Sequence, residues 1–152
     1  MVEKPRLITG IHLLLRRFNN SLSENEYLFH KRVGTGFFDN YFSVPGGHID
    51  GFESPVDCAI RESQEELGIS IRHEDLHFVN VIYRIKVPEN EVRIDFCYAV
   101  TKWQGEIKSN EPDKHSDAKW YPFSKLPQPF VPYIEQAIKD IENKITFTQT
   151  VV

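Results

Sequence analysis

Residues 47–69 read Gly-His-Ile-Asp-Gly-Phe-Glu-Ser-Pro-Val-Asp-Cys-Ala-Ile-Arg-Glu-Ser-Gln-Glu-Glu-Leu-Gly-Ile, and no other stretch says as much about the chain. Ser54 followed by Pro55 predicts the start of a helix, because a serine side chain caps free backbone N–H groups and proline fits the first helical position. Gly68 predicts its end, because glycine readily takes the left-handed conformation that closes a helix. The sequence therefore predicts a helix from Pro55 to about Leu67 that follows a glycine turn.

This helix brings three carboxylates together. Glu62, Glu65 and Glu66 are spaced three and four apart and share one face, and Arg61 lies four residues before Glu65. Residues 47–69 hold six acids and one base, whereas the whole chain has a net charge of only −4. Carboxylates this close are costly unless a positive group lies among them, so we expect a divalent cation, which commonly serves a phosphate substrate.

Composition places the chain among ordinary globular proteins. Its 152 residues, 40% hydrophobic and 26% charged, fit a single domain over 1–152. Its longest apolar runs are too short for a membrane span, and it shows no signal-peptide pattern. Cys58 and Cys97 lack metal-type spacing and are expected to be small buried hydrophobes, which fits a cytoplasmic location. Mild acidity and the lack of a basic run argue against a nucleic-acid partner.

Periodicity and turn residues predict a mixed α/β (α+β) protein. Strands are expected at 7–17, 26–33, 41–44, 76–86, 92–103 and 119–123, and a second helix at 132–145. The first two strands are expected to form a hairpin, residues 45–47 a tight turn and 104–118 a long loop. Residues 145–152 are expected either to add an edge strand or to remain loose.

The spacing of the fixed residues is similar to the Nudix box. That family pattern is Gly-x5-Glu-x7-Arg-Glu-U-x-Glu-Glu-x-Gly-U, where U is bulky and aliphatic. Its fixed positions correspond to Gly47, Glu53, Arg61, Glu62, Glu65, Glu66, Gly68 and Ile69. Ser63 departs from the pattern, because the family usually has an aliphatic residue there, and we interpret this as a change in helix packing. The expected strand order around the box also resembles a Nudix domain.

The resemblance implies a Nudix fold, with a mixed sheet sandwiched between helices, and a MutT-like enzyme that cleaves a nucleoside triphosphate or another nucleoside diphosphate-linked substrate. It implies Mg²⁺, with Mn²⁺ as an alternative. The metal ligands that it implies are Glu62, Glu65, Glu66 and the carbonyl of Gly47. The catalytic set that it implies is Glu62, Glu65, Arg61 and Glu111, in which Arg61, together with Glu53, supports the loop and helix. The general base is either Glu62 or an acid on the loop before the last strand, where Glu111 is the natural candidate.

Simpler interpretations stand beside these. The glutamates could form a solvated helix face, Glu53 could merely complement the helix dipole, and Glu111 could be an ordinary loop acid. Residues that could contact a nucleotide, or could serve only as packing or surface residues, are His48, Arg32, Arg84, Arg93, Phe37, Phe38, Tyr41 and Phe42. Two other functions remain open: a catalytically silent nucleotide sensor and an RNA 5′ pyrophosphohydrolase. The expected partner is a small nucleotide, and the sequence leaves a homodimer open.

Overall fold

A computed structural model describes residues 1–151, and Val152 lies outside the described residues. The strands are β1 (Arg6–Asn19), β2 (Glu24–Lys31), β3 (Phe42–Ser43), β4 (Gly46–His48), β5 (His77–Lys86), β6 (Glu91–Val100), β7 (Lys119–Pro122) and β8 (Phe147–Val151). The helices are α1 (Pro55–Leu67) and α2 (Pro132–Glu142), and short 3₁₀ turns occur at His73–Asp75, Val87–Glu89 and Phe123–Lys125. The expected mixed α/β class is confirmed.

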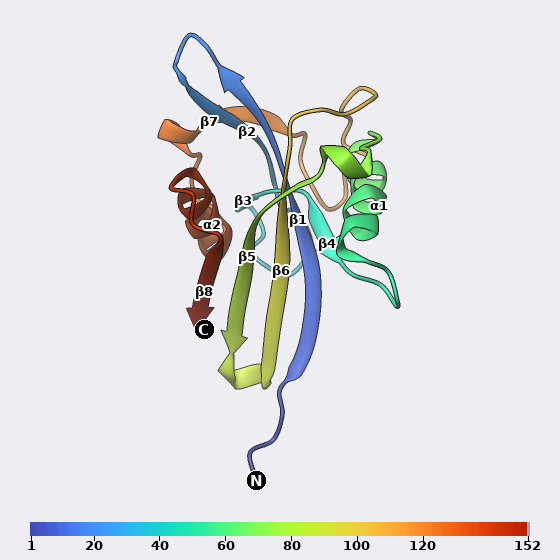
Figure 1. Cartoon of the computed structure of the whole chain (residues 1–152), viewed down its shortest axis with the longest axis vertical. Coiled ribbons are helices and arrows are strands. Elements are labelled where there is room, and N and C mark those ends of the chain that lie inside the picture. The colour runs from blue at the N-terminus through green and yellow to red at the C-terminus, as the bar shows by residue number, and fades with distance from the viewer. Residues whose placement is uncertain (152) are drawn as a thin grey trace.

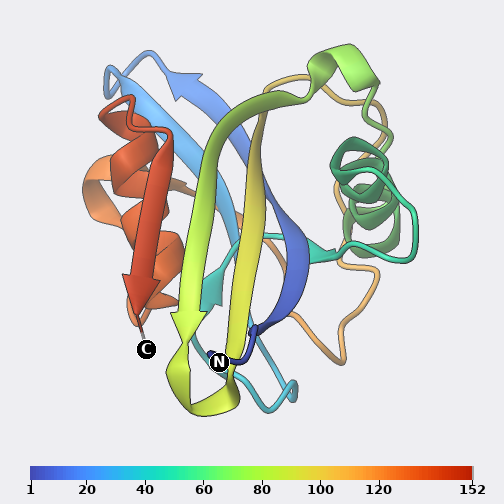
Figure 2. The same cartoon turned by 60° about the horizontal axis from the view of Figure 1, so that its bottom comes forward.

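The strands form one mixed sheet between the two helices. Its main order is β3-β2-β1-β6-β5-β8, with β4 paired to β1 and β7 paired to β2. The pairs β1–β6 and β5–β8 are parallel, and β1–β2 is the expected antiparallel hairpin. Figures 1 and 2 show α1 on one side of this sheet and α2 on the other. The sandwich that the resemblance implies is therefore present.

Each helix covers its own apolar core. The core under α1 includes Leu13, Ala59 and Leu67, and the core under α2 includes Phe29 and Ile138, all nearly inaccessible to water. Burial of this apolar surface is the main force that holds both layers on the sheet. Packing on both faces holds β1, β4 and β6 in place beside α1.

The ends of α1 follow the sequence prediction closely. The Ser54 hydroxyl accepts a hydrogen bond of 3.0 Å from the Asp57 amide, and Pro55 occupies the first turn. Gly68 ends the helix with a left-handed φ of 67°. Ser63, the one departure from the box, is buried and donates its hydroxyl to the Ile60 carbonyl at 2.7 Å. The serine is thus satisfied within the helix, without a charge or an unpaired hydroxyl.

Apart from shifts of one to three residues at strand ends, two predictions are wrong. The expected turn at 45–47 is largely a strand, because Gly46 and Gly47 pair with His12 and Ile11 of β1. A Cβ atom on Gly46 would lie only 2.3 Å from the Ile11 carbonyl, so glycine allows the two backbones to approach. Helix α2 ends at Glu142, because Lys144 adopts a left-handed φ of 59° and the chain then turns into edge strand β8.

Candidate functional site

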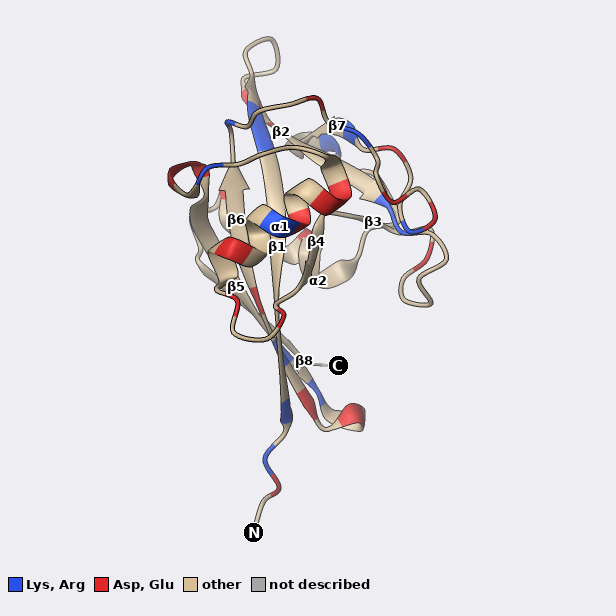
Figure 3. Cartoon of the chain, turned by 90° about the vertical axis from the view of Figure 1, so that its right-hand side faces the viewer, with Lys and Arg blue, Asp and Glu red and all other residues tan. Residues whose placement is uncertain are grey.

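Three carboxylates of α1 line the side of the helix that faces β4. The side chains of Glu62 and Glu66 are 12% and 6% exposed, whereas that of Glu65 is 52% exposed. Figure 3 shows the acidic positions of α1 beside its single basic residue, which is Arg61. These three carboxylates, Glu62, Glu65 and Glu66, are called the acidic wall below. Their exposure increases from Glu66, which is buried, to Glu65, which is open to solvent.

Strand β4 forms the floor beneath these acids. The Gly46 amide donates a 3.0 Å hydrogen bond to Glu66 Oε2. A Cβ atom on Gly47 would lie 2.1 Å from Glu62 Oε1, so the absence of a side chain at Gly47 leaves the space that the Glu62 carboxylate occupies. The carbonyl oxygen of Gly47 lies close to Gly10 of β1 instead, 3.0 Å from where a Cβ atom of that glycine would be. The two glycines therefore bring the backbone of β4 against both buried acids, Gly46 through its amide and Gly47 through its lack of a side chain.

Arg61 links the helix to the preceding loop. Its guanidinium donates to both carboxylate oxygens of Glu53, at 2.8 and 3.0 Å, and to the His48 carbonyl at 3.1 Å. It also donates to Glu62 at 3.0 Å and to Glu65 at 3.2 Å. Because a planar guanidinium holds several acceptors in fixed directions, Arg61 orients these carboxylates. Neither Arg61 nor Glu53 is free to act mainly on a ligand.

The electrostatics show that one arginine does not neutralise the acidic wall. Burial raises the pKa of Glu62, and burial together with the Glu62 carboxylate raises the pKa of Glu66 well above its ordinary value. In contrast, the Arg61 hydrogen bond lowers the pKa of Glu53 to about 2. Buried oxygen donors that resist ionisation are stabilised by a hard divalent cation, so the residues of this site fit such an ion.

The Glu53–Arg61 pair gives a prediction for acid stability. Since the folded pKa of Glu53 is about 2 and the ordinary value is 4.5, the pair stabilises the fold above about pH 4.5 and loses that effect as the pH falls toward 2. With no metal added to either protein, the unaltered protein is therefore expected to melt at a higher temperature than Glu53→Gln at neutral pH. This difference in melting temperature should shrink between pH 4.5 and 2. Thermal melts over pH 2–7 measure it. A difference that does not change with pH would contradict the assigned role.

The loop at 104–118 adds two side chains to the site. One donor atom each from Glu66, Glu111 and His115 lies within 4.8 Å of the other two. Burial lowers the pKa of His115, and its ring stacks on His30 with centroids 4.1 Å apart. Glu111, expected from the sequence, is therefore brought beside the box, although it lies 45 positions after Glu66 in the chain.

Basic residues share a cavity with the most buried acid of α1. Arg32, Arg84 and Arg93 line one cavity of about 120 Å³ together with Gly46 and Glu66. A pocket lined by both carboxylate and guanidinium groups suits a metal-bound polyphosphate, because arginines complement the phosphate oxygens that the metal leaves free.

The simple interpretation of Arg84 as a strand-surface charge is wrong. Arg84 is buried, forms an ion pair of 3.1 Å with buried Asp95, and lies 3.8 Å from the centre of the Tyr133 ring. Of the expected aromatic residues, Phe37 lines the cavity, whereas Phe38, Tyr41 and Phe42 pack against the core under α2.

Sequence reasoning missed several residues of this cavity, among them His12, Asp95, His115 and Tyr133. His115 had a usable signal, because it follows Glu111 by four residues, the spacing that puts two side chains on one side of a helical turn. Asp95 lies in a strand where polar residues alternate with apolar ones, but that pattern does not reveal its buried arginine partner.

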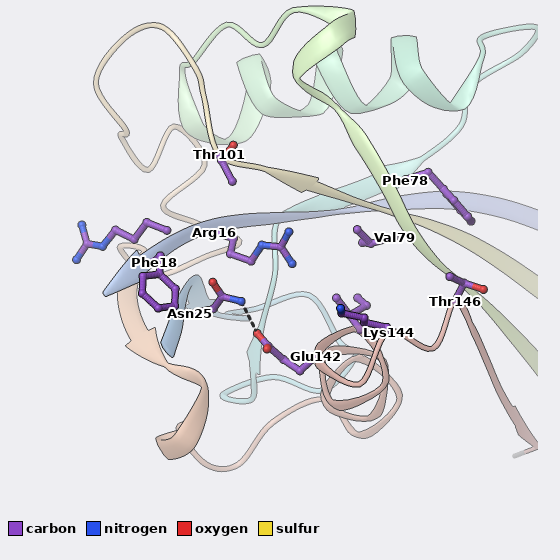
Figure 4. Close-up of a pocket in the computed structure, with 11 residues that line it drawn as sticks. Arg16, Phe18, Asn25, Phe78, Val79, Thr101, Glu142, Lys144 and Thr146 are labelled. Carbon is purple, nitrogen blue, oxygen red and sulfur yellow. Dashed lines mark hydrogen bonds between the residues drawn. The ribbon is translucent and has the colours of Figure 1, made fainter. Parts of the chain in front are cut away.

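A larger cavity of about 560 Å³ lies elsewhere, between β1, β5 and the end of α2. Figure 4 shows Arg16, Phe18 and Phe78 around it, with Asn25 hydrogen-bonded to Glu142. It contains none of the box residues, so its size does not mark it as the catalytic pocket. Among residues 1–151, no helix is both long and apolar enough to cross a membrane.

Comparisons with known proteins agree with this geometry. A model of the NUDIX domain family matches residues 13–141. The 8-oxo-dGTP diphosphatase of Escherichia coli is 33% identical over 82 residues, which cover 54% of this chain and 60% of that protein. An RNA pyrophosphohydrolase of Psychrobacter cryohalolentis is 36% identical over 72 residues, which cover 47% of this chain and 39% of that protein. The chain thus aligns with less than two thirds of either relative.

A solved structure matches over a greater length. The MutT NUDIX hydrolase from Burkholderia pseudomallei superposes with a TM-score of 0.75 at 26% identity, and the match covers 88% of this chain and 97% of that one. The likeness extends over the sheet and both helices, well beyond the box.

Proposed function

This chain belongs to the NUDIX domain family, and on that premise we propose that it is a metal-dependent pyrophosphohydrolase. Its substrate would be a nucleoside triphosphate or another nucleoside diphosphate-linked molecule, and its metal Mg²⁺, with Mn²⁺ as an alternative. We propose further that residues 1–152 act as a single domain. The activity named for two similar proteins, on 8-oxo-dGTP and on RNA, involves phosphoric anhydrides in both cases.

One observation carries the proposal: Glu66, the buried end of the acidic wall of α1, lines the same small cavity as three arginines. Glu66 is buried there and Glu62 is buried one helical turn away, and burial raises the pKa of both, so a cation would stabilise their ionised forms. Arg32, which directly follows β2, and Arg93 of β6 line the same cavity. A silent acidic surface would not need buried carboxylates, and it would not need arginines facing them.

The residues divide into holding and positioning roles. Glu62, Glu65 and Glu66 would hold the metal, and a main-chain carbonyl of the β4 glycines, proposed from the family pattern to be that of Gly47, would complete the site. When bound, a divalent ion neutralises phosphate charge and makes water a stronger nucleophile. Arg61 keeps Glu62 and Glu65 in position through its hydrogen bonds.

Two carboxylates suit the role of proton acceptor. Burial raises the pKa of Glu62 toward the range in which a base works near neutral pH. Glu111 lies beside Glu66 on the loop at 104–118, where its carboxylate accepts a 3.1 Å hydrogen bond from Lys114. The two differ in a pH–rate profile, because replacing the true base with glutamine removes the acidic limb of that profile.

The function is tested with a panel of nucleotides that includes 8-oxo-dGTP, incubated with Mg²⁺ or Mn²⁺ while release of pyrophosphate or phosphate is measured. Turnover of at least one nucleotide is expected, and none without metal. Tight nucleotide binding without hydrolysis would instead favour a silent sensor.

An RNA substrate predicts a different response to salt. Each phosphate contact with a long RNA adds to the salt dependence of binding, with a slope of about 0.7 per contact for single strands. The chain is mildly acidic overall, so we expect mononucleotide substrates and a shallow dependence of KM on salt between 50 and 200 mM, roughly the range over which multi-contact binding weakens strongly. A steep loss for a 5′-triphosphorylated RNA that is also cleaved faster than mononucleotides would contradict this expectation.

A further inference from the structure

The loop before β7 is attached to the end of α1 and not merely close to it. The Lys108 amide donates to the Leu67 carbonyl at 2.9 Å, and the Asn110 amide donates to the Glu66 carbonyl at 3.1 Å. These bonds use carbonyls that the end of a helix leaves free. The residues that follow Asn110 are therefore held at a fixed place beside the Glu66 side chain.

Those residues form a single helical turn. The amides of Lys114 and His115 both donate to the Glu111 carbonyl, at 2.9 and 3.0 Å. Residues four apart in such a turn project to the same side. Glu111 and His115 consequently point together toward the end of α1, where the carboxylate of Glu66 lies.

The His115 ring is placed as a ligand would be. Its Nε2 atom lies 3.9 Å from Glu66 Oε1, too far for a hydrogen bond and well suited to two donors that share one ion. The donor atoms of His115, Glu66 and Glu111 all fall within 4.8 Å of one another. Two donors about 2.1 Å from the same octahedral ion lie about 3.0 Å apart when adjacent and about 4.2 Å apart when opposite, so small movements of these side chains bring all three donors onto one ion.

A second histidine supports this ring. His30 of β2 is 3% exposed and stacks on His115, with centroids 4.1 Å apart and ring planes within 12° of parallel. It forms a hydrogen bond with the Val44 backbone, while its Nε2 atom has no partner among the described residues. A buried ring stacked in this way restricts rotation of His115 and keeps Nε2 directed at Glu66.

We propose that His115 is a nitrogen ligand of the divalent ion that Glu66 and Glu111 bind, and that it makes the site prefer Mn²⁺ to Mg²⁺. The inference rests on the proposed function, since it concerns the metal of that reaction. Mg²⁺ is bound almost entirely by oxygen, whereas imidazole is a good ligand for first-row transition ions, and Mn²⁺ accepts both kinds of donor. The carboxylates alone would not distinguish the two ions in this way.

The direct test is pulsed electron paramagnetic resonance of bound Mn²⁺. A ligating imidazole produces a ¹⁴N coupling, which should be present in the unaltered protein and should change to a ¹⁵N pattern when only histidine is labelled. The coupling should disappear in His115→Gln and persist in His48→Gln, a matched control because His48 lines the same cavity. The labelling experiment needs no variant, so it stands even if His115→Gln fails to fold.

Metal affinity gives the second readout. His115→Gln should weaken Mn²⁺ binding by at least about 10-fold, since loss of a residue that merely supports a metal ligand already costs about that much. The effect on Mg²⁺ binding, measured by competition, should be smaller. His115→Glu should bind Mn²⁺ without nitrogen coupling and shift the preference toward Mg²⁺.

The outcomes separate this inference from the proposed function. Bound Mn²⁺ without a histidine nitrogen coupling, or a coupling that survives in His115→Gln, would overturn the role of His115 and leave the hydrolase proposal standing. Failure of the unaltered protein to bind either ion would overturn both.

Discussion

Glu66→Gln is expected to lower kcat for nucleotide hydrolysis by about 1,000-fold and to leave the fold intact. A bound metal supplies several kcal/mol of transition-state stabilisation, and about 4 kcal/mol corresponds to a factor of 1,000. The replacement keeps the shape of the side chain, and its amide oxygen can still accept the hydrogen bond from the Gly46 amide. What it removes is the negative charge that would hold the ion.

The same variant should be at least as stable as the unaltered protein when metal is absent. Because burial raises the folded pKa of Glu66, the unaltered protein loses stability as the pH rises through that pKa and the buried carboxyl must ionise. A neutral glutamine escapes this cost. Melting temperatures without metal should therefore be equal at low pH, with Glu66→Gln higher at neutral pH.

Steady-state kinetics at saturating metal, beside Glu106→Gln, make the comparison specific. Glu106 is an exposed acid of the loop at 104–118, and no side-chain hydrogen bond or ion pair is found for it within residues 1–151. Its replacement should therefore leave kcat unchanged. Comparable turnover by Glu66→Gln and the unaltered protein would rule out Glu66 as a metal ligand in the reaction.

The features of the site that the sequence predicted are those encoded locally. Glu62, Glu65 and Glu66 share a face because helical periodicity requires it, and Ser54 and Gly68 mark the ends of that helix through the chemistry of single residues. For residues 145–152 the sequence allowed either an edge strand or a loose segment. It could not decide between them, because the pairing of β8 with β5 depends on residues about 65 positions away.

What the sequence did not predict depends on tertiary contact. His115 approaches Glu66 only because the loop bonds to the end of α1, and no local pattern encodes that attachment. Arg84 and Asp95 each looked like ordinary strand residues, yet they form a buried ion pair across β5 and β6. Charge pairing across strands requires register, and register is set by the whole sheet.

Gly47 is another residue whose role depends on a tertiary contact, and this role can be tested directly. The family pattern marks this glycine, and the turn expected there suggested a need for backbone freedom. The structure gives a different reason: a Cβ atom would lie 2.1 Å from Glu62 Oε1 and 2.3 Å from its Cδ, while φ lies outside the left-handed region. Alanine therefore suits the backbone, and the clash falls on the Glu62 carboxylate.

Gly47→Ala should consequently displace Glu62 and lower kcat/KM by about 100-fold, the loss that a shift of about 1 Å in a catalytic group can cause. The cost to stability should be small, about 1 kcal/mol, because a side-chain end moves and the backbone does not. The decisive measurement is a double-mutant cycle with Glu62→Ala. If the clash with Glu62 is the whole cause, Gly47→Ala should cost nothing further once that carboxylate is gone, in either activity or melting temperature. Losses that add in the double variant would mean that Gly47 serves β4 itself, independently of the acid above it.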